Sequence, residues 1–158
     1  MTTLKTGTMN IDDVKYDGVA VVDYMRLNTK YTIKEVKAPA GYLLDNTVYE
    51  IKFTQLDLKN QKDGTYRNHY DVTLTDKPTS AYVTKTDITG KDELEGAELV
   101  LKQGNDVIDK WTSTKEPHKI YNLVFGTEYT LTETISPDGY ATTESITFTY
   151  SEDGQIVQ

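Results

Sequence analysis

Two glutamates occupy strand positions where the sequence pattern favours apolar side chains, and they are the strongest candidates for chemistry in this chain. Glu35 lies in the segment YTIKEVKAPAGY at 31–42, and Glu133 lies in YTLTETISPDGY at 129–140. Each shares its strand face with a tyrosine and an aliphatic residue, because side chains alternate across a strand. A carboxyl group there has three alternatives: acid–base chemistry, burial without chemistry, or a water-facing place on an edge strand. Its recurrence at one offset favours a buried carboxyl with a chemical role.

The two segments form an internal repeat, in which Tyr, Thr, Glu, Pro, Gly and Tyr recur without a gap after 98 residues. Each copy is predicted to be a strand that ends at a Pro-x-Gly turn. An internal repeat predicts two units of similar fold. The polar Lys-Pro-Thr-Ser segment at 77–80 is the best linker between them. We therefore predict domains at residues 1–78 and 79–158, with residues 1–18 mostly loop.

Composition excludes several classes of function. The 158 residues carry a formal net charge of −8 and contain no cysteine. The negative charge argues against a nucleic acid or an anionic membrane as partner, and the lack of cysteine excludes disulfides and thiolate metal sites. No apolar run is long enough to span a membrane, so we expect no membrane insertion. His69 and His118 have no second ligand at metal spacing, so we predict neither a metal nor a cofactor.

The remaining pattern predicts an all-β chain of short strands and turns, which is typical of a β-sandwich. The segment at 93–102 fits helical spacing as well as a short strand, and the glycines that bracket it favour the strand. Ser-Glu-Asp-Gly at 151–154 predicts a hairpin turn. The segments with strand-like alternation are 48–58, 69–76, 81–88, 98–101, 107–113, 118–123 and 144–150.

The repeated segments resemble the glutamate-containing motif of Cna protein B-type domains, also called SpaA-like or prealbumin-like domains. These domains recur in Gram-positive surface adhesins and pilins. The segment AYVTKTDITGKDELEGAELVL at 81–101 is similar to the opening of such a domain, WTSTKEPHKIYNLVFGTEYTLTE at 111–133 to its middle, and VTLTDKP at 72–78 to its closing strand. The resemblance covers about residues 19–158. It implies two tandem immunoglobulin-like or prealbumin-like β-sandwich units.

The resemblance also implies an intramolecular isopeptide bond between a lysine of the first strand and an Asp or Asn of the last strand. By position, Lys85 is the nucleophile and Glu133 the assisting acid of the second unit, while Glu35 assists and Asp76 is the acceptor in the first. An amine buried among apolar groups loses the solvation of its charged form and becomes a nucleophile. A buried carboxyl can stay protonated, polarise the acceptor carbonyl and transfer protons as water or ammonia leaves. Without the resemblance, Lys85 would be taken for a solvated lysine and Asp76 for a turn residue.

Comparison by position predicts that neither set of residues is complete. Lys85 precedes Glu133 by 48 residues, whereas Lys5 precedes Glu35 by 30. We therefore expect the first unit to lack its opening strand or strands. The second unit is expected to end at Gln158 before its closing strand, so that this chain alone forms no cross-link. The incomplete unit is then able to accept a closing strand from another chain.

The favoured function is a structural stalk or spacer of a bacterial cell-surface adhesin or pilin, located outside the cell and partnered by adjacent repeats of the same protein. The alternative is a ligand-binding adhesin module that contacts a host protein or glycan, which predicts an exposed aromatic patch on one face. No catalytic triad, phosphate loop or thiol nucleophile supports a turnover enzyme. The expected chemistry is at most a single-turnover autocatalytic isopeptide reaction. The chain shows neither an LPxTG-type wall-sorting motif nor a recognisable pilin polymerisation motif.

Overall fold

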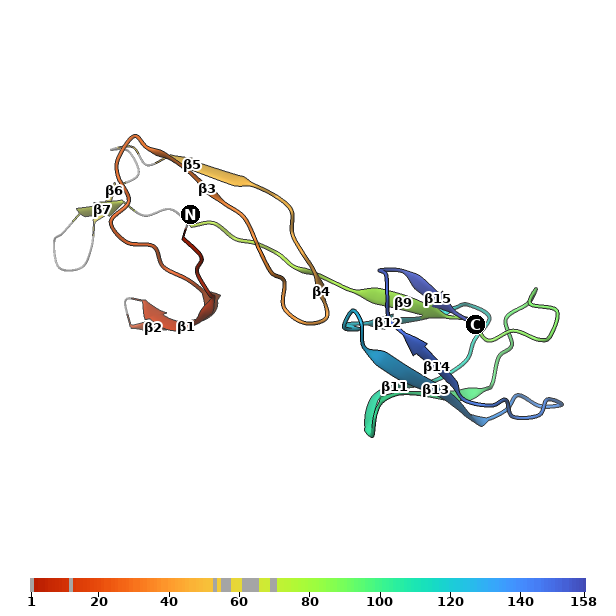
Figure 1. Cartoon of the computed structure of the whole chain (residues 1–158). Coiled ribbons are helices and arrows are strands. Elements are labelled where there is room, and N and C mark those ends of the chain that lie inside the picture. Colours follow the sequence, from red (N-terminus) through yellow and green to blue (C-terminus); the bar gives the residue numbers. More distant parts are fainter. Residues whose placement is uncertain (1, 12, 53, 55–57, 61–65, 69–70) are drawn as a thin grey trace. The chain divides into compact units, whose positions relative to one another are not determined.

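The structure, a computed structural model, consists of strands and connecting segments (Figure 1). It describes all residues except 1, 12, 53, 55–57, 61–65 and 69–70. The part of the chain that it describes contains no helix that could cross a membrane. The predicted all-β class is confirmed. The chain divides into two compact units, Met1–Ile33 with Val48–Thr73 and Lys34–Thr47 with Leu74–Gln158.

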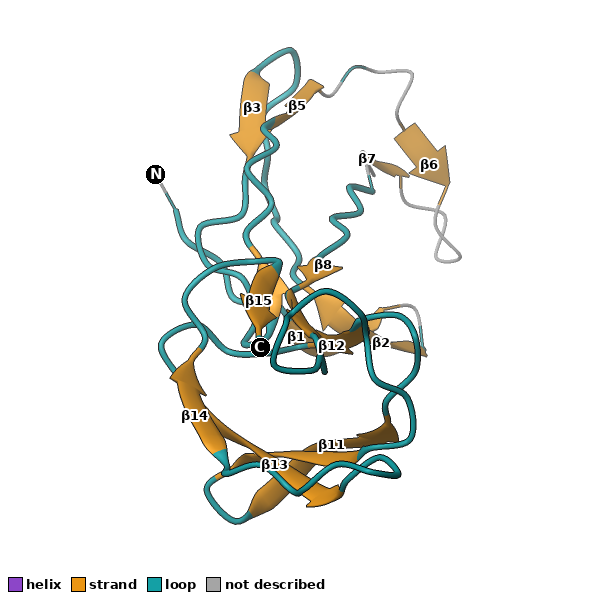
Figure 2. Ribbon diagram, turned by 90° about the vertical axis from the view of Figure 1, so that its right-hand side faces the viewer, coloured by secondary structure: helices purple, strands orange, loops and turns teal. Residues whose placement is uncertain are grey.

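The second unit is a sandwich of two sheets (Figure 2). One sheet has the antiparallel order β11-β10-β13-β14, and the other has the order β12-β9-β15. In the second sheet β9 pairs antiparallel with β12 and parallel with β15, with Val83 opposite Val157. These strands are β9 (Ser80–Val83), β10 (Glu98–Gln103), β11 (Asp106–Thr112), β12 (His118–Tyr121), β13 (Glu128–Ile135), β14 (Ile146–Thr149) and β15 (Gln155–Val157).

Side chains from both sheets meet in one core, because apolar residues alternate with polar ones along the strands. Burial of each large apolar side chain stabilises the fold by about 1.5–3 kcal/mol. All members of the core lie between residues 79 and 158, so the segment 34–47 contributes none of them. The members are Ala81, Val83, Ala97, Leu99, Leu101, Ile120, Leu123, Tyr129, Leu131, Tyr150 and Val157.

The connection from β14 to β15 crosses from one sheet to the other and is fixed at Ser80. Asp153 Oδ1 accepts hydrogen bonds from the Ser80 amide at 2.7 Å and from its hydroxyl at 3.1 Å. The hydroxyl of Tyr150 donates to the Ser80 carbonyl at 2.9 Å. The turn predicted at 151–154 is present, but its assignment as a hairpin was wrong, because β14 and β15 lie in different sheets. Residues typical of a turn indicate only local structure. They cannot show that Asp153 binds Ser80 at the start of β9, which is distant in the sequence.

Asp153 makes the stability of this unit depend on pH. Burial raises the pKa of Asp153, but the hydrogen bonds from Ser80 and the charges of Lys77 and Lys119 outweigh it and hold that pKa below its usual value. A carboxyl with a lowered folded-state pKa stabilises the fold above its unfolded value of about 3.9, and this contribution is lost as the pH falls through the folded value. We expect Asp153→Asn to lower the free energy of unfolding by about 1 kcal/mol at neutral pH. Urea unfolding should show that the difference disappears below the folded pKa; a pH-independent difference would contradict the assignment.

The described residues of the first unit form three separate strand pairs. Ile51 is the one buried hydrophobic residue among its described residues. The strands are β1 (Gly7–Ile11) with β2 (Val14–Val19), β3 (Lys30–Ile33) with β5 (Tyr49–Lys52), and β6 (Leu58–Asn60) with β7 (Tyr66–Asn68). Tyr31 lies opposite Ile51. A further pair, β4 (Tyr42–Leu43) with β8 (Lys77–Pro78), belongs to the second unit.

Three local predictions need correction. Residues 1–18 are not mostly loop, because they contain β1 and most of β2; the side chains of this hairpin are mostly exposed, so its composition is largely polar. Of the strand predicted at 69–76, residues 71–76 form no strand, and 69–70 lie outside the described residues. The strand predicted at 48–58 is formed by Tyr49–Lys52, and 53 and 55–57 again lie outside the described residues.

The predicted exposed linker at 77–80 was also wrong in its local structure. Lys77 and Pro78 form β8, and Thr79 and Ser80 are buried. The polar composition of this segment indicates exposure, but Thr79 can be buried because its hydroxyl donates a hydrogen bond to the carbonyl oxygen of Leu123 at 2.6 Å. The domain boundary between residues 78 and 79 stays a prediction.

Candidate functional site

Strand alternation brings Lys85 and Glu133 into the space between the two sheets. Val83 on β9 is buried, and Lys85, two residues later, extends its side chain to the same side. On β13 the buried residues are Tyr129, Leu131 and Glu133, which share one face. The glutamate is therefore the third buried residue of an otherwise apolar face.

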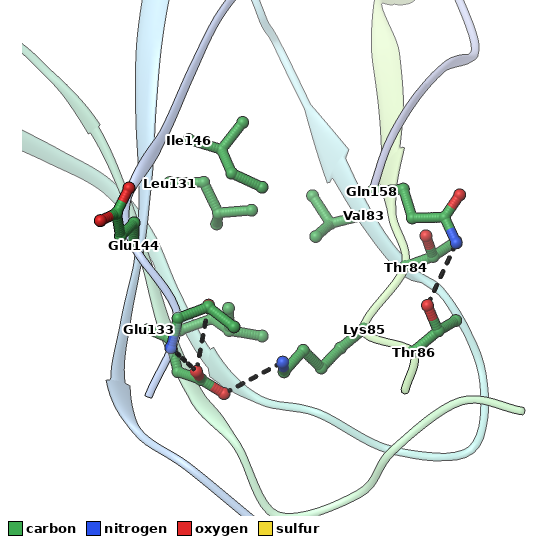
Figure 3. Close-up of a pocket in the computed structure, with 11 residues that line it drawn as sticks. Val83, Thr84, Lys85, Thr86, Leu131, Glu133, Glu144, Ile146 and Gln158 are labelled. Atoms are coloured by element: carbon green, nitrogen blue, oxygen red, sulfur yellow. Dashed lines mark hydrogen bonds and ion pairs between the residues drawn. The ribbon is translucent and has the colours of Figure 1, made fainter. Parts of the chain in front are cut away.

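Lys85 and Glu133 point toward each other across the interior (Figure 3). Lys85 Nζ lies 3.3 Å from Glu133 Oε1, and the two side chains are 15% and 1% exposed. Glu133 Oε2 accepts hydrogen bonds from the Thr143 amide at 2.7 Å and from its hydroxyl at 3.1 Å. The Lys85 amide donates to Glu93 Oε2 at 2.8 Å. Thr143 thus orients the carboxyl group, and Glu93 holds the backbone of the lysine.

The carboxyl oxygen that faces the lysine is available to a third group. Glu133 Oε1 is buried, and its contact with Lys85 Nζ at 3.3 Å is an ion pair without hydrogen-bond geometry. Buried polar atoms are normally hydrogen-bonded, so an exception of this kind points to a functional or strained site. A side chain that entered beside Lys85 could share a proton with this oxygen.

A cavity of about 160 Å³ adjoins the pair and gives such a side chain room. Apolar residues line part of it, among them Val83, Leu131 and Ile146, and Gln158 also lines it (Figure 3). The apolar part of the lining lowers the local dielectric constant, which strengthens electrostatic interactions between the groups inside. The site therefore combines an amine, an oriented carboxyl group and space for a reaction partner.

The first copy of the motif repeats the hydrogen bonds of the second. Glu35 Oε2 accepts a hydrogen bond from the Asp45 amide at 2.7 Å, ten residues later, as Glu133 does from Thr143. The tyrosine that opens each copy accepts a bond from the amide five residues before it, at 2.7 and 2.9 Å. The repeat is therefore structural, although Glu35 is only half-buried.

The structure joins Lys85 to Glu133, but it does not assemble the set predicted for the domain at residues 1–78. Asp76 precedes β8 outside any strand, and no ion pair or hydrogen bond among the described residues joins it to Glu35. The roles of these two residues stay predictions. His118 binds Asp109, with Nε2 and Oδ2 2.8 Å apart. The described residues contain no cluster of three metal-ligating side chains.

Sequence reasoning missed Thr143 and Glu93. Thr143 holds Glu133 partly through its backbone amide, so its counterpart in the first copy, Asp45, needs no matching side chain. Only the shared spacing of ten residues after each glutamate could have indicated it. Glu93 acts across a turn, eight residues after Lys85, and carries no distinguishing pattern.

Two facing sheets, a parallel pair of first and last strands, and no helix in the described residues define a prealbumin-like β-sandwich. The chain belongs to the SpaA family of prealbumin-like fold domains, whose sequence model matches residues 1–66 and 79–158. No curated protein matches the chain.

Solved structures that are similar to this chain have low sequence identity to it. The Bacillus anthracis TIE protein is 24% identical, with a TM-score of 0.50, over 95% of this chain and 26% of that one. The pilus adhesin SpaC of Lactobacillus rhamnosus GG is 22% identical, with a TM-score of 0.42, over 93% and 23% of the two chains. The shaft pilin spaA of the same organism is 17% identical, with a TM-score of 0.40, over 77% and 59%. The chain thus spans about a quarter of the first two proteins.

Proposed function

We propose that this chain is a stalk or spacer segment of a bacterial surface adhesin or pilin, located outside the cell, and that its second unit is built to form one isopeptide bond. The observation that carries the chemistry is the shielded pair of Lys85 and Glu133, 3.3 Å apart beside a cavity. Membership of the SpaA family supports the structural role. The adjacent repeats of the same protein are the expected partners.

The reaction is a single acyl transfer. The neutral amine of Lys85 attacks the side-chain carbonyl carbon of an Asn or Asp, and a C–N bond forms. Glu133 donates a proton to the carbonyl oxygen or to the leaving group and takes one from the lysine nitrogen. Ammonia leaves from Asn or water from Asp. Because the product bond stays in the protein, the site turns over once and is not that of an enzyme.

The register of β15 supports a position for the acceptor. Val157 pairs with Val83, and both side chains are buried. The Thr84 amide continues this ladder by donating to the Val157 carbonyl at 3.0 Å. Since side chains alternate along strands, a strand that continues β15 has its next inward position directly after Gln158, beside Lys85. A strand donated by another chain could supply the same position only if it displaced β15 from β9.

The chain of 158 residues is expected to contain no cross-link, because no Asn or Asp occupies the position beside Lys85. Its intact mass, measured under denaturing conditions, should equal the mass of the sequence. A mass lower by one water or one ammonia would overturn this expectation, and fragmentation would then show which lysine reacted.

For the predicted domain at residues 1–78 we propose the same division of roles, with Glu35 as the assisting acid and Asp76 as the acceptor. The support is that Glu35, like Glu133, accepts a hydrogen bond from the backbone amide ten residues later. The domain limits that go with this proposal are 1–78 and 79–158. Substitution of Asp76 by Ala in a longer chain with an upstream opening strand should abolish a mass loss in that unit.

Ligand binding is a second candidate because one face of the sheet β12-β9-β15 exposes aromatic and aliphatic groups. Tyr121 is 51% and Ile156 67% exposed. Lys119 Nζ lies 5.2 and 5.1 Å from the ring centroids of Tyr82 and Tyr121. A host protein or glycan that bound this face should lose affinity on Tyr121→Ser, whereas a purely structural module should bind neither.

A further inference from the structure

The two copies of the Pro-x-Gly-Tyr turn have one conformation but different surroundings. In each, the tyrosine amide donates to the proline carbonyl, at 3.2 Å in the first copy and 3.1 Å in the second. Gly41 and Gly139 have φ of 81° and 84°. These values define type II turns, in which the third position favours glycine. Gly41 is nevertheless buried, whereas Gly139 is exposed.

The first turn is docked on the start of β9. The Gly41 carbonyl accepts hydrogen bonds from the Thr79 amide at 3.0 Å and from its hydroxyl at 3.1 Å. A Cβ on Gly41 would lie 2.7 Å from the backbone oxygen of Asn122, so only glycine allows this approach. The Asn122 amide in turn donates to the Thr79 carbonyl at 3.0 Å. We call the group formed by Thr79, Asn122 and Leu123 the Thr79 surface.

Backbone pairing extends the docked contact. Directly after Gly41, β4 pairs antiparallel with β8, with Tyr42 opposite Pro78 and Leu43 opposite Lys77. The turn therefore binds mainly through main-chain groups and glycine geometry, and these do not depend on the side chains that differ between the copies.

The second turn has the same groups and no occupant. Nothing lies within 4 Å of a Cβ built on Gly139, and no described residue donates to its carbonyl. Tyr140 and Ala141, the counterparts of β4, form no strand. The position that differs at the tip, Asp138 in place of Ala40, is exposed in both copies.

We propose that the turn at 136–141 docks on another repeat of the same type. The turn would bind the part of that repeat that corresponds to the Thr79 surface. The partner is identified by the contact that this chain makes with itself at Gly41. It must present a threonine amide and hydroxyl at the start of its first strand, and a backbone carbonyl close enough to exclude a Cβ. This inference concerns the packing of successive repeats and does not depend on the isopeptide chemistry.

The test is a fusion in which a second copy of residues 43–158 follows the complete chain. The appended block keeps every core residue but lacks the turn at 35–42, so its Thr79 surface is free. With isotope label confined to that block, the amide of its Thr79 should exchange at least about tenfold more slowly than in the same fusion carrying Gly139→Ala, which is about 1.4 kcal/mol. Asp138→Ala, at the exposed tip of the same turn, is the matched control and should leave the exchange slow.

A second readout is the stability of the appended block. Gly139→Ala should lower its unfolding midpoint in the fusion more than Asp138→Ala does, while in the single chain Gly139→Ala should add only backbone strain. The proposal is overturned if the Thr79 amide of the appended block exchanges rapidly in the unsubstituted fusion. It is also overturned if Gly139→Ala leaves that exchange unchanged.

Discussion

A chain extended by an asparagine directly after Gln158, followed by a short polar tail, is expected to lose one ammonia and become cross-linked at Lys85. The added residue continues β15, whose Val157 already lies opposite Val83. Its carboxamide then enters the cavity beside the lysine and Glu133 Oε1. Intact-mass measurement would show the loss, and peptide fragmentation would locate the new bond.

The matched variants separate the roles of the three groups. Lys85→Arg keeps a cation near Glu133 but cannot act as a nucleophile, so it should abolish the mass loss. Glu133→Gln keeps the shape of the side chain and removes the proton transfer, which should slow the reaction by about 10²–10⁴-fold. Moving the asparagine one position further along the strand turns its side chain to the other face and should prevent the bond.

Two results would count against this site. If the shifted asparagine reacts as fast as the one directly after Gln158, the register deduced from β9 and β15 does not govern the reaction. If cross-linking survives Lys85→Arg, another lysine is the nucleophile. Thr143→Val should slow the reaction without abolishing it, because the backbone amide still holds Glu133 Oε2 at 2.7 Å.

Gly41→Ala is expected to destabilise the second unit far more than Gly139→Ala does. Both glycines have nearly the same positive φ, so both substitutions carry about 1–2 kcal/mol of left-handed backbone strain. At Gly41 the new Cβ would also meet the Asn122 oxygen at 2.7 Å, which adds overpacking of about 1–3 kcal/mol. If the turn detaches instead, the hydrogen bonds from Thr79 are lost, at about 1 kcal/mol each.

Chemical unfolding of the two single variants measures this difference, because strain common to both cancels. We expect Gly41→Ala to lose at least about 2 kcal/mol more than Gly139→Ala, by the sum of those local effects. Equal losses would mean that the docking of the first turn contributes nothing measurable. Thr79→Val offers an independent check, since it removes the hydroxyl but leaves the amide to bind Gly41.

The sequence predicted the pairing of Lys85 with Glu133 because repetition and resemblance both constrain those two residues. The all-β class and the strand at 98–101 followed from alternation and glycine placement, and the structure contains them. Features that depend on backbone groups far away in the sequence could not be predicted from local patterns. The burial of Thr79 depends on the carbonyls of Gly41 and Leu123, and nothing in the polar segment around it indicates them.

The same limit explains the errors at 71–76 and 151–154. Alternation states which side chains would share a face, but a strand also needs a neighbour with which to pair. Residues 71–76 have the alternation but form no strand. At 151–154 the turn residues are typical of a hairpin, yet the hydrogen bonds from Ser80 to Asp153 direct the chain into the other sheet.

The parallel pairing of β9 with β15 has a mechanical consequence. Tension that enters the sandwich through the start of β9 and leaves through the end of β15 acts along both strands in opposite directions. The hydrogen bonds between parallel strands are evenly spaced, so this load shears all of them together instead of opening them one at a time. Forced unfolding is governed by the unfolding rate, and shear geometry gives this pair a higher barrier than peeling would. A covalent bond between Lys85 and an acceptor that continues β15 would join the same two strands. The tension would then be carried by that bond and not by the hydrogen bonds and packing of the core.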